Sequence, residues 1–225
     1  MKGMIRAVIF DLDGTLVAMK LKVKEAKKKL IQRLREIGVN IDRIDLKIPT
    51  EEIISKTIKE YGFSRDYLMK LVDEVYIPYE LEAAEVAELR EGIKDVLMEL
   101  RAMGFKLAVA SNSAKPGVYL ALENTSIKGF FDVIVTRSDV SRMKPNGAII
   151  AEALKRLNVK PSEAIYIGDT TYDILAAREV GVKSMAVSGG AHSINLILNS
   201  EPDILVKDVK EIPKALKRLA SQGKE

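Results

Sequence analysis

The second half of the chain alternates short β-rich runs with amphipathic segments. The runs FKLAVAS, FDVIVT, EAIYIGD and VKSMAVS predict strands, whereas GIKDVLMELRAMG, NGAIIAEALKRLN, TYDILAAREVG and EIPKALKRLA have the spacing of helices. Strand and helix in repetition indicate a parallel sheet that is covered on both faces. Ligands bind such sheets beyond the carboxyl ends of the strands. We therefore expect an α/β fold with a doubly wound parallel sheet, and a functional site at that edge.

Two acidic residues, Asp11 and Asp13, follow the first apolar run in the stretch VIFDLDGTLV. A turn would account for Asp13 and Gly14, because Asp and Gly are common turn residues. It leaves Asp11 unexplained, because a carboxylate directly after an apolar run lies where the loss of hydration is costly. Acids held this close usually share a cation or a proton. The pair therefore favours a functional site, with a simple turn as the alternative.

Residues 18–88 interrupt the alternation of strands and helices, because they show helical periodicity and little strand signal. Glycine, proline and serine mark the expected helix ends within this segment, at Gly38, Pro49, Gly62 and Ser64. We expect a helical cap at residues 18–88, inserted into a core formed by residues 1–17 and 89–225. The two connections would run through Val17-Ala18 and Glu88-Leu89-Arg90.

The composition argues against several kinds of site and partner. The 225-residue chain has no Cys and one His, so it can form neither a thiolate metal site nor a cluster of histidines. A net charge of +4, with acids and bases interspersed, does not indicate nucleic-acid binding. No stretch is apolar enough to span a membrane, and MKGMIRAVIF lacks the apolar region of a signal peptide. We expect a cytoplasmic protein with no membrane partner, and no feature predicts an oligomeric state.

Four short motifs lie at the ends of expected strands or at the starts of expected helices. They are FDLDGTLV at residues 10–17, Ser111-Asn112 in VASN, Lys144 in RMKP, and GDTTYD at residues 168–173. Each motif is weak alone, but the four in this order form a strong signal. With these motifs the chain resembles the haloacid dehalogenase superfamily, and within it the phosphatases that have a helical cap after the first strand. The resemblance implies a Rossmann-like core with an inserted cap.

The resemblance also implies a covalent mechanism that uses a metal ion. Asp11 would be the nucleophile that forms an aspartyl-phosphate. Because this acid and a phosphate repel each other, a divalent cation is needed between them, and oxygen ligands suit Mg²⁺. The implied ligands are the carboxylates of Asp11 and Asp169 and the backbone carbonyl of Asp13, while Asp173 would hold waters around the metal or Lys144. Asp169 and Asp173 are expected on one face at the start of a helix, or, as the alternative, only to stabilise the helix dipole.

The other motif residues would contact the phosphoryl group. In the pattern of the family, the Ser111 hydroxyl and Asn112 donate to phosphoryl oxygens, and Lys144 offsets the charge that spreads over them in the transition state. Thr15 would fix its loop and donate toward the phosphate. Asp13 would give a proton to the leaving alcohol and then take one from water. Seen alone, Ser111-Asn112 could instead be a helix N-cap, and Lys144 could be a surface lysine.

Our first hypothesis is a Mg²⁺-dependent phosphomonoester hydrolase that acts on a small phosphorylated metabolite, similar to phosphoglycolate phosphatase. The cap favours a small substrate, because a lid over the site excludes water and bulky partners. The alternative enzyme is a phosphomutase of the β-phosphoglucomutase kind, which shares all four motifs, although Thr15 favours a phosphatase. A receiver-like switch that accepts a phosphoryl group on Asp is a third hypothesis, opposed by the cap and by Asp13. The only histidine, His192, is expected to be structural.

Overall fold

The computed structural model describes the backbone of residues 4–40 and 48–222, in which six parallel strands form one sheet. Their bounds are Ala7–Phe10 (β1), Lys106–Ser111 (β4), Val133–Thr136 (β5), Ala164–Gly168 (β6), Lys183–Val187 (β7) and Ile204–Val206 (β8). The strand order is β5-β4-β1-β6-β7-β8. Successive strands are therefore added on one side of β1 as far as β5 and then on its other side from β6 onward, so the strand order reverses at β1. Ligand sites lie at such reversals. The expected doubly wound α/β fold is confirmed.

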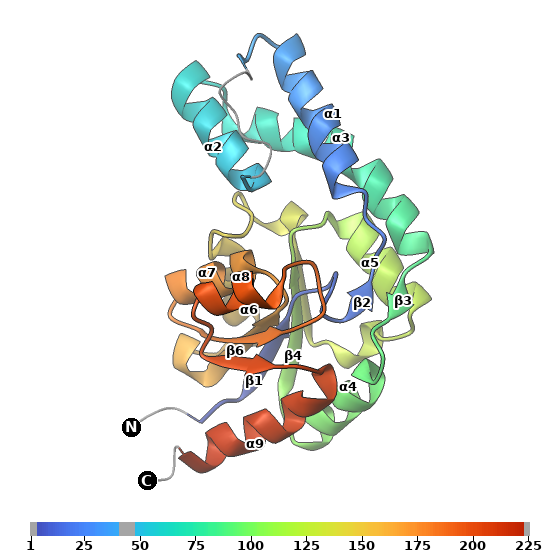
Figure 1. Ribbon diagram of the computed structural model, residues 1–225, viewed down its shortest axis with the longest axis vertical. Coiled ribbons are helices and arrows are strands. Elements are labelled where there is room, and N and C mark those ends of the chain that lie inside the picture. The colour runs from blue at the N-terminus through green and yellow to red at the C-terminus, as the bar shows by residue number, and fades with distance from the viewer. Residues whose placement is uncertain (1–3, 41–47, 223–225) are drawn as a thin grey trace.

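Helices cover both faces of the sheet (Figure 1). One face carries α4 (Ile93–Ala102), α5 (Lys115–Asn124) and α9 (Ile212–Gln222), and the other carries α6 (Ala148–Leu157), α7 (Thr171–Glu179) and α8 (Ile194–Asn199). Successive residues of β1 alternate between them, because side chains of a strand point to opposite faces. Val8 and Phe10 join the first layer, while Ala7 and Ile9 join the second. Both faces of β1 are therefore buried.

Three further helices lie beyond the carboxyl edge of the sheet (Figure 1). These cap helices, α1 (Val23–Glu36), α2 (Thr50–Tyr61) and α3 (Arg65–Glu85), share a buried apolar cluster of their own. An antiparallel pair of strands, β2 (Val17–Ala18) and β3 (Glu88–Leu89), connects them to the sheet. The hydroxyl of Ser64 caps α3 by accepting the Tyr67 N–H at 3.3 Å, as expected. The division into two domains at residues 18 and 88 stays a prediction.

The sequence pattern does not predict several short elements. They are α5, α8, β8 and the 3₁₀ helices η1 (Lys128–Phe130), η2 (Arg137–Asp139), η3 (Pro161–Glu163) and η4 (Val209–Glu211). α5 begins with Lys115-Pro116-Gly117, which resembles a turn, but proline is tolerated in the first turn of a helix. β8 has only three residues, too few for an alternating pattern. Among the described residues, no helix is both long and apolar enough to cross a membrane.

A buried ion pair joins the cap helices to the rest of the chain. Glu80 of α3 is 1% exposed, and Arg137 of η2 is 3% exposed. Arg137 Nη1 lies 2.6 Å from Glu80 Oε1, and Nη2 lies 3.2 Å from Oε2, so the contact is bidentate. Glu80 Oε2 also accepts the Ala114 N–H at 2.9 Å, and Arg137 Nε donates to Asp73 at 2.9 Å. The pair therefore fixes α3 against the start of α5.

We predict that Glu80→Ala destabilises the fold by about 3–5 kcal/mol, because the guanidinium group of Arg137 stays buried after losing its main partner. Glu82 offers a matched control on the same helix. Its carboxylate lies 2.5 Å from Lys22 Nζ, but both side chains are more than half exposed. Glu82→Ala should change the free energy of unfolding by less than about 1 kcal/mol. Urea unfolding of the two variants measures the difference, and equal losses would contradict the prediction.

Candidate active site

The carboxyl ends of three adjacent strands bring distant motifs together. Asp11 follows β1, Ser111 ends β4, and Asp169 follows β6. These strands are neighbours in the sheet, with β1 in the middle. The Asp11 N–H donates to Ile167 O at 2.8 Å, which continues the pairing of β1 with β6 beyond the end of the strand. The convergence expected from the sequence is therefore present.

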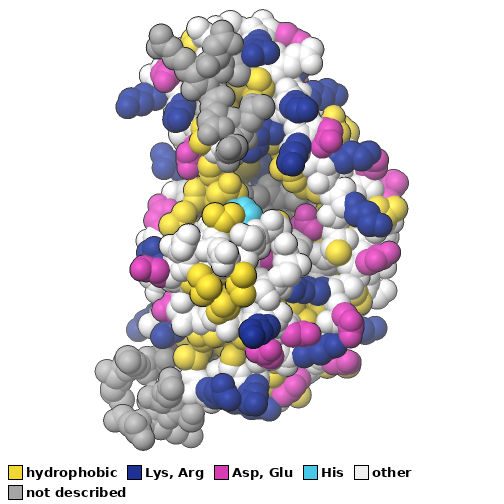
Figure 2. Space-filling view, in the orientation of Figure 1, with side chains coloured by type: hydrophobic (Ala, Val, Ile, Leu, Met, Phe, Trp, Pro, Cys, Tyr) yellow, Lys and Arg dark blue, Asp and Glu magenta, His cyan; other side chains and the backbone are white. Residues whose placement is uncertain are grey.

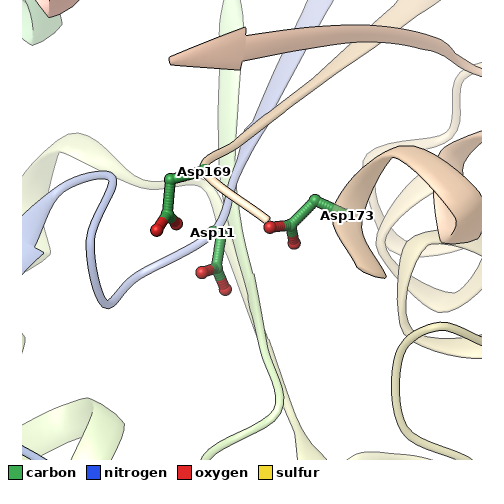
Figure 3. Close-up of side chains that lie close together, drawn as sticks. All are labelled: Asp11, Asp169 and Asp173. Carbon is green, nitrogen blue, oxygen red and sulfur yellow. The ribbon is translucent and has the colours of Figure 1, made fainter. Parts of the chain in front are cut away.

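Three carboxylates, those of Asp11, Asp169 and Asp173, point toward one another (Figure 3). One oxygen from each lies within 4.8 Å of the others, and all three residues are buried. Burial raises the pKa of Asp11 to about 7. The charge of Lys144 opposes this rise, and the charges of the neighbouring acids add to it. Burial and the charge of Asp173 raise the pKa of Asp169 to about 6. Buried hard oxygen donors with excess negative charge fit a divalent cation, so this cluster could hold a metal ion.

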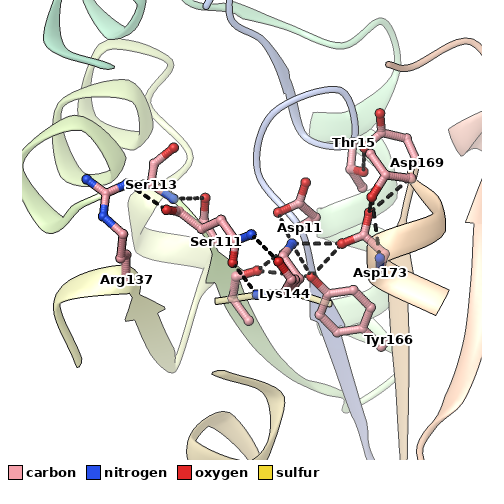
Figure 4. Close-up of polar contacts among 12 residues, drawn as sticks. Asp11, Thr15, Ser111, Ser113, Arg137, Lys144, Tyr166, Asp169 and Asp173 are labelled. Carbon is pink, nitrogen blue, oxygen red and sulfur yellow. Dashed lines mark hydrogen bonds and ion pairs between the residues drawn. The ribbon is translucent and has the colours of Figure 1, made fainter. Parts of the chain in front are cut away.

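Lys144 supplies the positive charge of the cluster (Figure 4). Its Nζ lies 2.6 Å from Asp11 Oδ1, 2.7 Å from Asp173 Oδ1 and 2.8 Å from the Tyr166 hydroxyl. Burial alone would lower the pKa of Lys144, but the two carboxylates outweigh that effect and raise it. The side chain is only 5% exposed, so the alternative of a surface lysine is wrong.

Asp173 both caps α7 and holds Lys144. Its Oδ2 accepts the backbone N–H and the hydroxyl of Thr170 at 2.9 and 2.6 Å, whereas its Oδ1 accepts from Lys144. α7 begins at Thr171, as the run TYDILAAREVG predicts, and Asp169 lies in the preceding loop, so the two acids do not share a helix face as expected. The two acids meet because this loop turns back toward the cluster. His192 Nδ1 accepts the Thr171 N–H at 3.1 Å, which is a structural contact.

Two loops fix the carboxylate of Asp169. The Thr15 hydroxyl donates to Asp169 Oδ1 at 3.0 Å, and the Ala191 N–H donates to Oδ2 at 2.6 Å. Gly14 has φ +83°, and a Cβ at this position would lie 2.3 Å from Asp169 Oδ2. Thr15 fixes its loop as expected, and its one hydroxyl hydrogen is directed to Asp169, so its contact with a phosphate stays a prediction.

The side chain of Asn112 holds the backbone of Lys144. Its Oδ1 accepts the Lys144 N–H at 2.8 Å, and its Nδ2 donates to Lys144 O at 3.1 Å. This side chain therefore fixes the Lys144 backbone, and the expected donation from Asn112 to a phosphoryl oxygen stays a prediction. Ser111 Oγ accepts the Ser113 N–H at 3.2 Å, so its own hydrogen remains for a ligand. The N-cap alternative for Ser111-Asn112 is wrong, because Ala114 occupies the N-cap of α5.

Asp13 lies apart from the carboxylate cluster. Its Oδ1 accepts the Met19 N–H at 2.8 Å, and the side chain is half-buried. Burial, opposed by this hydrogen bond, raises the pKa of Asp13 to about 7. An acid with a pKa near 7 can both donate and accept a proton at neutral pH. The carboxylate therefore has the protonation behaviour that a general acid and base requires.

Two further residues outside the four motifs, Tyr166 and Arg90, contact the site. The Tyr166 hydroxyl, from within β6, contacts Lys144 Nζ. Arg90, directly after β3, donates to Gly14 O at 2.5 Å and to Ser188 O, so it ties the connection from the cap helices to the loop after Asp11. The one sequence signal for Tyr166 was a tyrosine in an apolar strand, because a buried hydroxyl needs a hydrogen-bond partner. Arg90 carried no such signal.

A cavity of about 170 Å³ lies between the cap helices and the carboxyl edge of the sheet. Thr50 and Tyr76, whose hydroxyls are 3.0 Å apart, line it on the cap side. Asn112, Arg137 and Lys144 line it on the opposite side. Figure 2 shows a recess at this boundary. For comparison, an apolar cavity of about 150 Å³ holds benzene, so the volume fits a small molecule.

Comparison with known proteins relates the whole chain to hydrolases. The family model of haloacid dehalogenase-like hydrolases matches residues 8–187. The chain is 29% identical over 233 residues to the glyceraldehyde 3-phosphate phosphatase of Methanopyrus kandleri, covering 96% of this chain and 99% of the relative. It is 26% identical over 209 residues to the pyrophosphatase PpaX of Oceanobacillus iheyensis, covering 92% and 95%. A haloacid dehalogenase-like family hydrolase from Streptococcus pneumoniae has a similar structure, with a TM-score of 0.64, 27% identity, and coverage of 94% and 98%.

We predict that Asp13 makes the metal-free protein more stable as the pH falls from about 8 to about 6. Its pKa is about 7 in the folded protein, against an ordinary value of 3.8. Between these values the folded state binds a proton that the unfolded state releases, so the free energy of unfolding rises by about 1.4 kcal/mol per unit fall in pH. Above pH 7 the Asp13 carboxylate is charged in both the folded and the unfolded state, so the gain in the free energy of unfolding is absent.

Urea unfolding in excess EDTA, repeated across this pH range, measures the effect. Asp13→Asn cannot take up the proton, so its free energy of unfolding should rise less on acidification than that of the wild type. Parallel pH profiles for the two proteins would show that Asp13 titrates at its ordinary pKa.

Proposed function

Because the chain belongs to the haloacid dehalogenase-like hydrolases, we propose that it is a Mg²⁺-dependent phosphatase that acts on small phosphorylated metabolites through a phosphoaspartate at Asp11. The observation that carries this proposal is the position of Asp11. It lies at the end of the central strand, in contact with the buried ammonium group of Lys144 and beside two further acids. A receiver-like switch explains neither the cap helices nor Asp13, and the hydrolase family opposes it.

Asp11 has one oxygen fixed and one available for attack. Lys144 binds Oδ1 at 2.6 Å, so Oδ2 would be the oxygen that attacks a bound phosphoryl group. In the first step Oδ2 forms a bond to phosphorus, the bond to the leaving oxygen breaks, and Asp13 gives that oxygen a proton. In the second step Asp13 takes a proton from water, the water oxygen attacks phosphorus, and phosphate leaves with Asp11 restored. A bound Mg²⁺ would offset the negative charge of the carboxylates and the phosphate.

The cavity supports a small leaving group. Its volume of about 170 Å³ would accommodate a leaving group of a few carbon atoms. One relative is named for glyceraldehyde 3-phosphate and another for pyrophosphate, and in both compounds a phosphoryl group is attached to a small leaving group. We therefore favour such compounds over the hexose phosphates that a phosphomutase would use.

The proposed function predicts phosphate release that depends on a divalent ion. A panel of glyceraldehyde 3-phosphate, phosphoglycolate, pyrophosphate, glucose 6-phosphate, β-glucose 1-phosphate and nucleoside monophosphates should be assayed with Mg²⁺. We expect the small compounds to be hydrolysed fastest, EDTA to abolish turnover and Mg²⁺ to restore it. Full activity in excess EDTA would contradict the metal requirement. Conversion of β-glucose 1-phosphate to glucose 6-phosphate without phosphate release would favour the phosphomutase.

A second prediction separates the roles of Asp11 and Asp13. Asp13→Asn removes proton transfer but keeps the nucleophile, and p-nitrophenol is a leaving group that departs without a proton. With p-nitrophenyl phosphate, this variant should release a burst of about one equivalent of nitrophenol and then turn over slowly, with phosphate trapped on Asp11. An alkyl phosphate should lose rate already in the first step.

Asp11→Asn is the control, because it lacks the nucleophile and should give no burst with either substrate. A burst from Asp11→Asn would assign the nucleophile to another residue. Equal losses on aryl and alkyl substrates by Asp13→Asn, without a trapped phosphoenzyme, would remove Asp13 as the acid and base.

A further inference from the structure

The loop that leads into Lys144 is held by two residues of the cap helices. Glu51 of α2 accepts the Met143 N–H with Oε2 at 3.0 Å. Arg65, the first residue of α3, donates from Nη1 to Ser141 O at 3.1 Å. Met143 directly precedes Lys144, so the contact made by Glu51 lies one residue before the lysine. Two groups from the cap helices therefore determine where this loop lies.

At this contact the Glu51 carboxylate loses hydration. Its side chain is 7% exposed, and burial of a carboxylate is unfavourable unless donors compensate. Arg65 Nη1 lies 2.9 Å from Glu51 Oε1, and the Ser55 hydroxyl donates to the same oxygen at 3.1 Å. An acid in the first turn of a helix stabilises the helix dipole even when exposed. The dipole alone gives no reason to bury it against the loop before Lys144.

The backbone of Lys144 is therefore held from two sides. Asn112 binds its N–H and its carbonyl from the end of β4, while Glu51 binds the preceding N–H from α2. The Lys144 ammonium group makes contacts of 2.6 and 2.7 Å with Asp11 and Asp173, which leave little tolerance for displacement. A shift of about 1 Å in a catalytic group can lower the rate by about 100-fold.

We propose that Glu51 is a positioning residue that couples the seating of the cap helices to the placement of Lys144. With α2 against the core, the Glu51 carboxylate fixes the Met143 peptide, and Lys144 reaches Asp11. Displacement of α2 breaks this contact, and of the contacts that hold the backbone at Met143 and Lys144 from the two sides, only those of Asn112 remain. The expected effect on rate rests on the proposed function, whereas the contact between Glu51 and Met143 does not depend on it.

The test compares Glu51→Ala, Glu51→Gln and the control Glu60→Ala, an exposed glutamate on the same helix. Glu51→Ala should lower kcat by about 10- to 100-fold with a smaller change in KM, because it displaces a catalytic group and leaves substrate contacts in place. Glu51→Gln should retain much of the rate, because its amide oxygen can still accept the Met143 N–H. Glu60→Ala should match the wild type.

A double-variant cycle distinguishes positioning from a general structural effect. In the Lys144→Ala background, Glu51→Ala should cause no further loss of kcat, because the group that it positions is gone. Hydrogen exchange of the Met143 amide gives a readout without turnover: it should be faster in Glu51→Ala than in Glu60→Ala and the wild type. Equal loss of kcat in both backgrounds, or unchanged exchange at Met143, would overturn the proposal. Failure of the proposed function would appear separately, as a wild type that releases phosphate from no substrate of the panel.

Discussion

The contact of the Lys144 ammonium group with Asp11 and Asp173 makes the rest of the site possible. Three buried carboxylates would repel one another strongly, and one ammonium group offsets part of their charge. The remaining negative charge affects the pKa values of the three acids unequally. Asp173, which binds Lys144 and caps α7, has a lowered pKa, whereas Asp11 and Asp169 have raised ones. The cluster therefore keeps an excess of negative charge, which is the electrostatic condition for binding a divalent cation.

The sheet supplies the framework for this contact. β1 is buried on both faces and hydrogen-bonded on both sides, so Asp11 emerges from the most constrained strand. The partners of the Lys144 ammonium group come from the end of β1, from the adjacent strands β4 and β6, and from the start of α7. A network from rigid elements can hold a charged side chain in one rotamer with little further loss of entropy. The loop before Lys144 is the part that the sheet does not fix.

The sequence predicted five of the six strands of the sheet, the parallel topology and which acids would meet, because these follow from periodicity and from the common edge of a parallel sheet. It did not predict contacts that depend on how separate elements lie against each other. Asn112 clamps the backbone of Lys144, and Glu80 meets Arg137 across 57 residues of chain. Such contacts have no periodic signal, since each depends on one particular tertiary arrangement.

The cap helices reach the site through polar groups as well as apolar ones. Glu80 accepts the Ala114 N–H just after the Ser111-Asn112 motif, and Glu51 accepts the Met143 N–H just before Lys144. Both carboxylates are buried, and each is compensated by an arginine, Arg137 or Arg65, and by a backbone N–H that flanks a motif. An apolar interface tolerates sliding, because dispersion contacts are not directional, but a hydrogen bond to a peptide N–H is lost within about 1 Å of displacement. These two acids therefore make the geometry of the motifs sensitive to the exact seating of α2 and α3, which an apolar contact of equal area would not do.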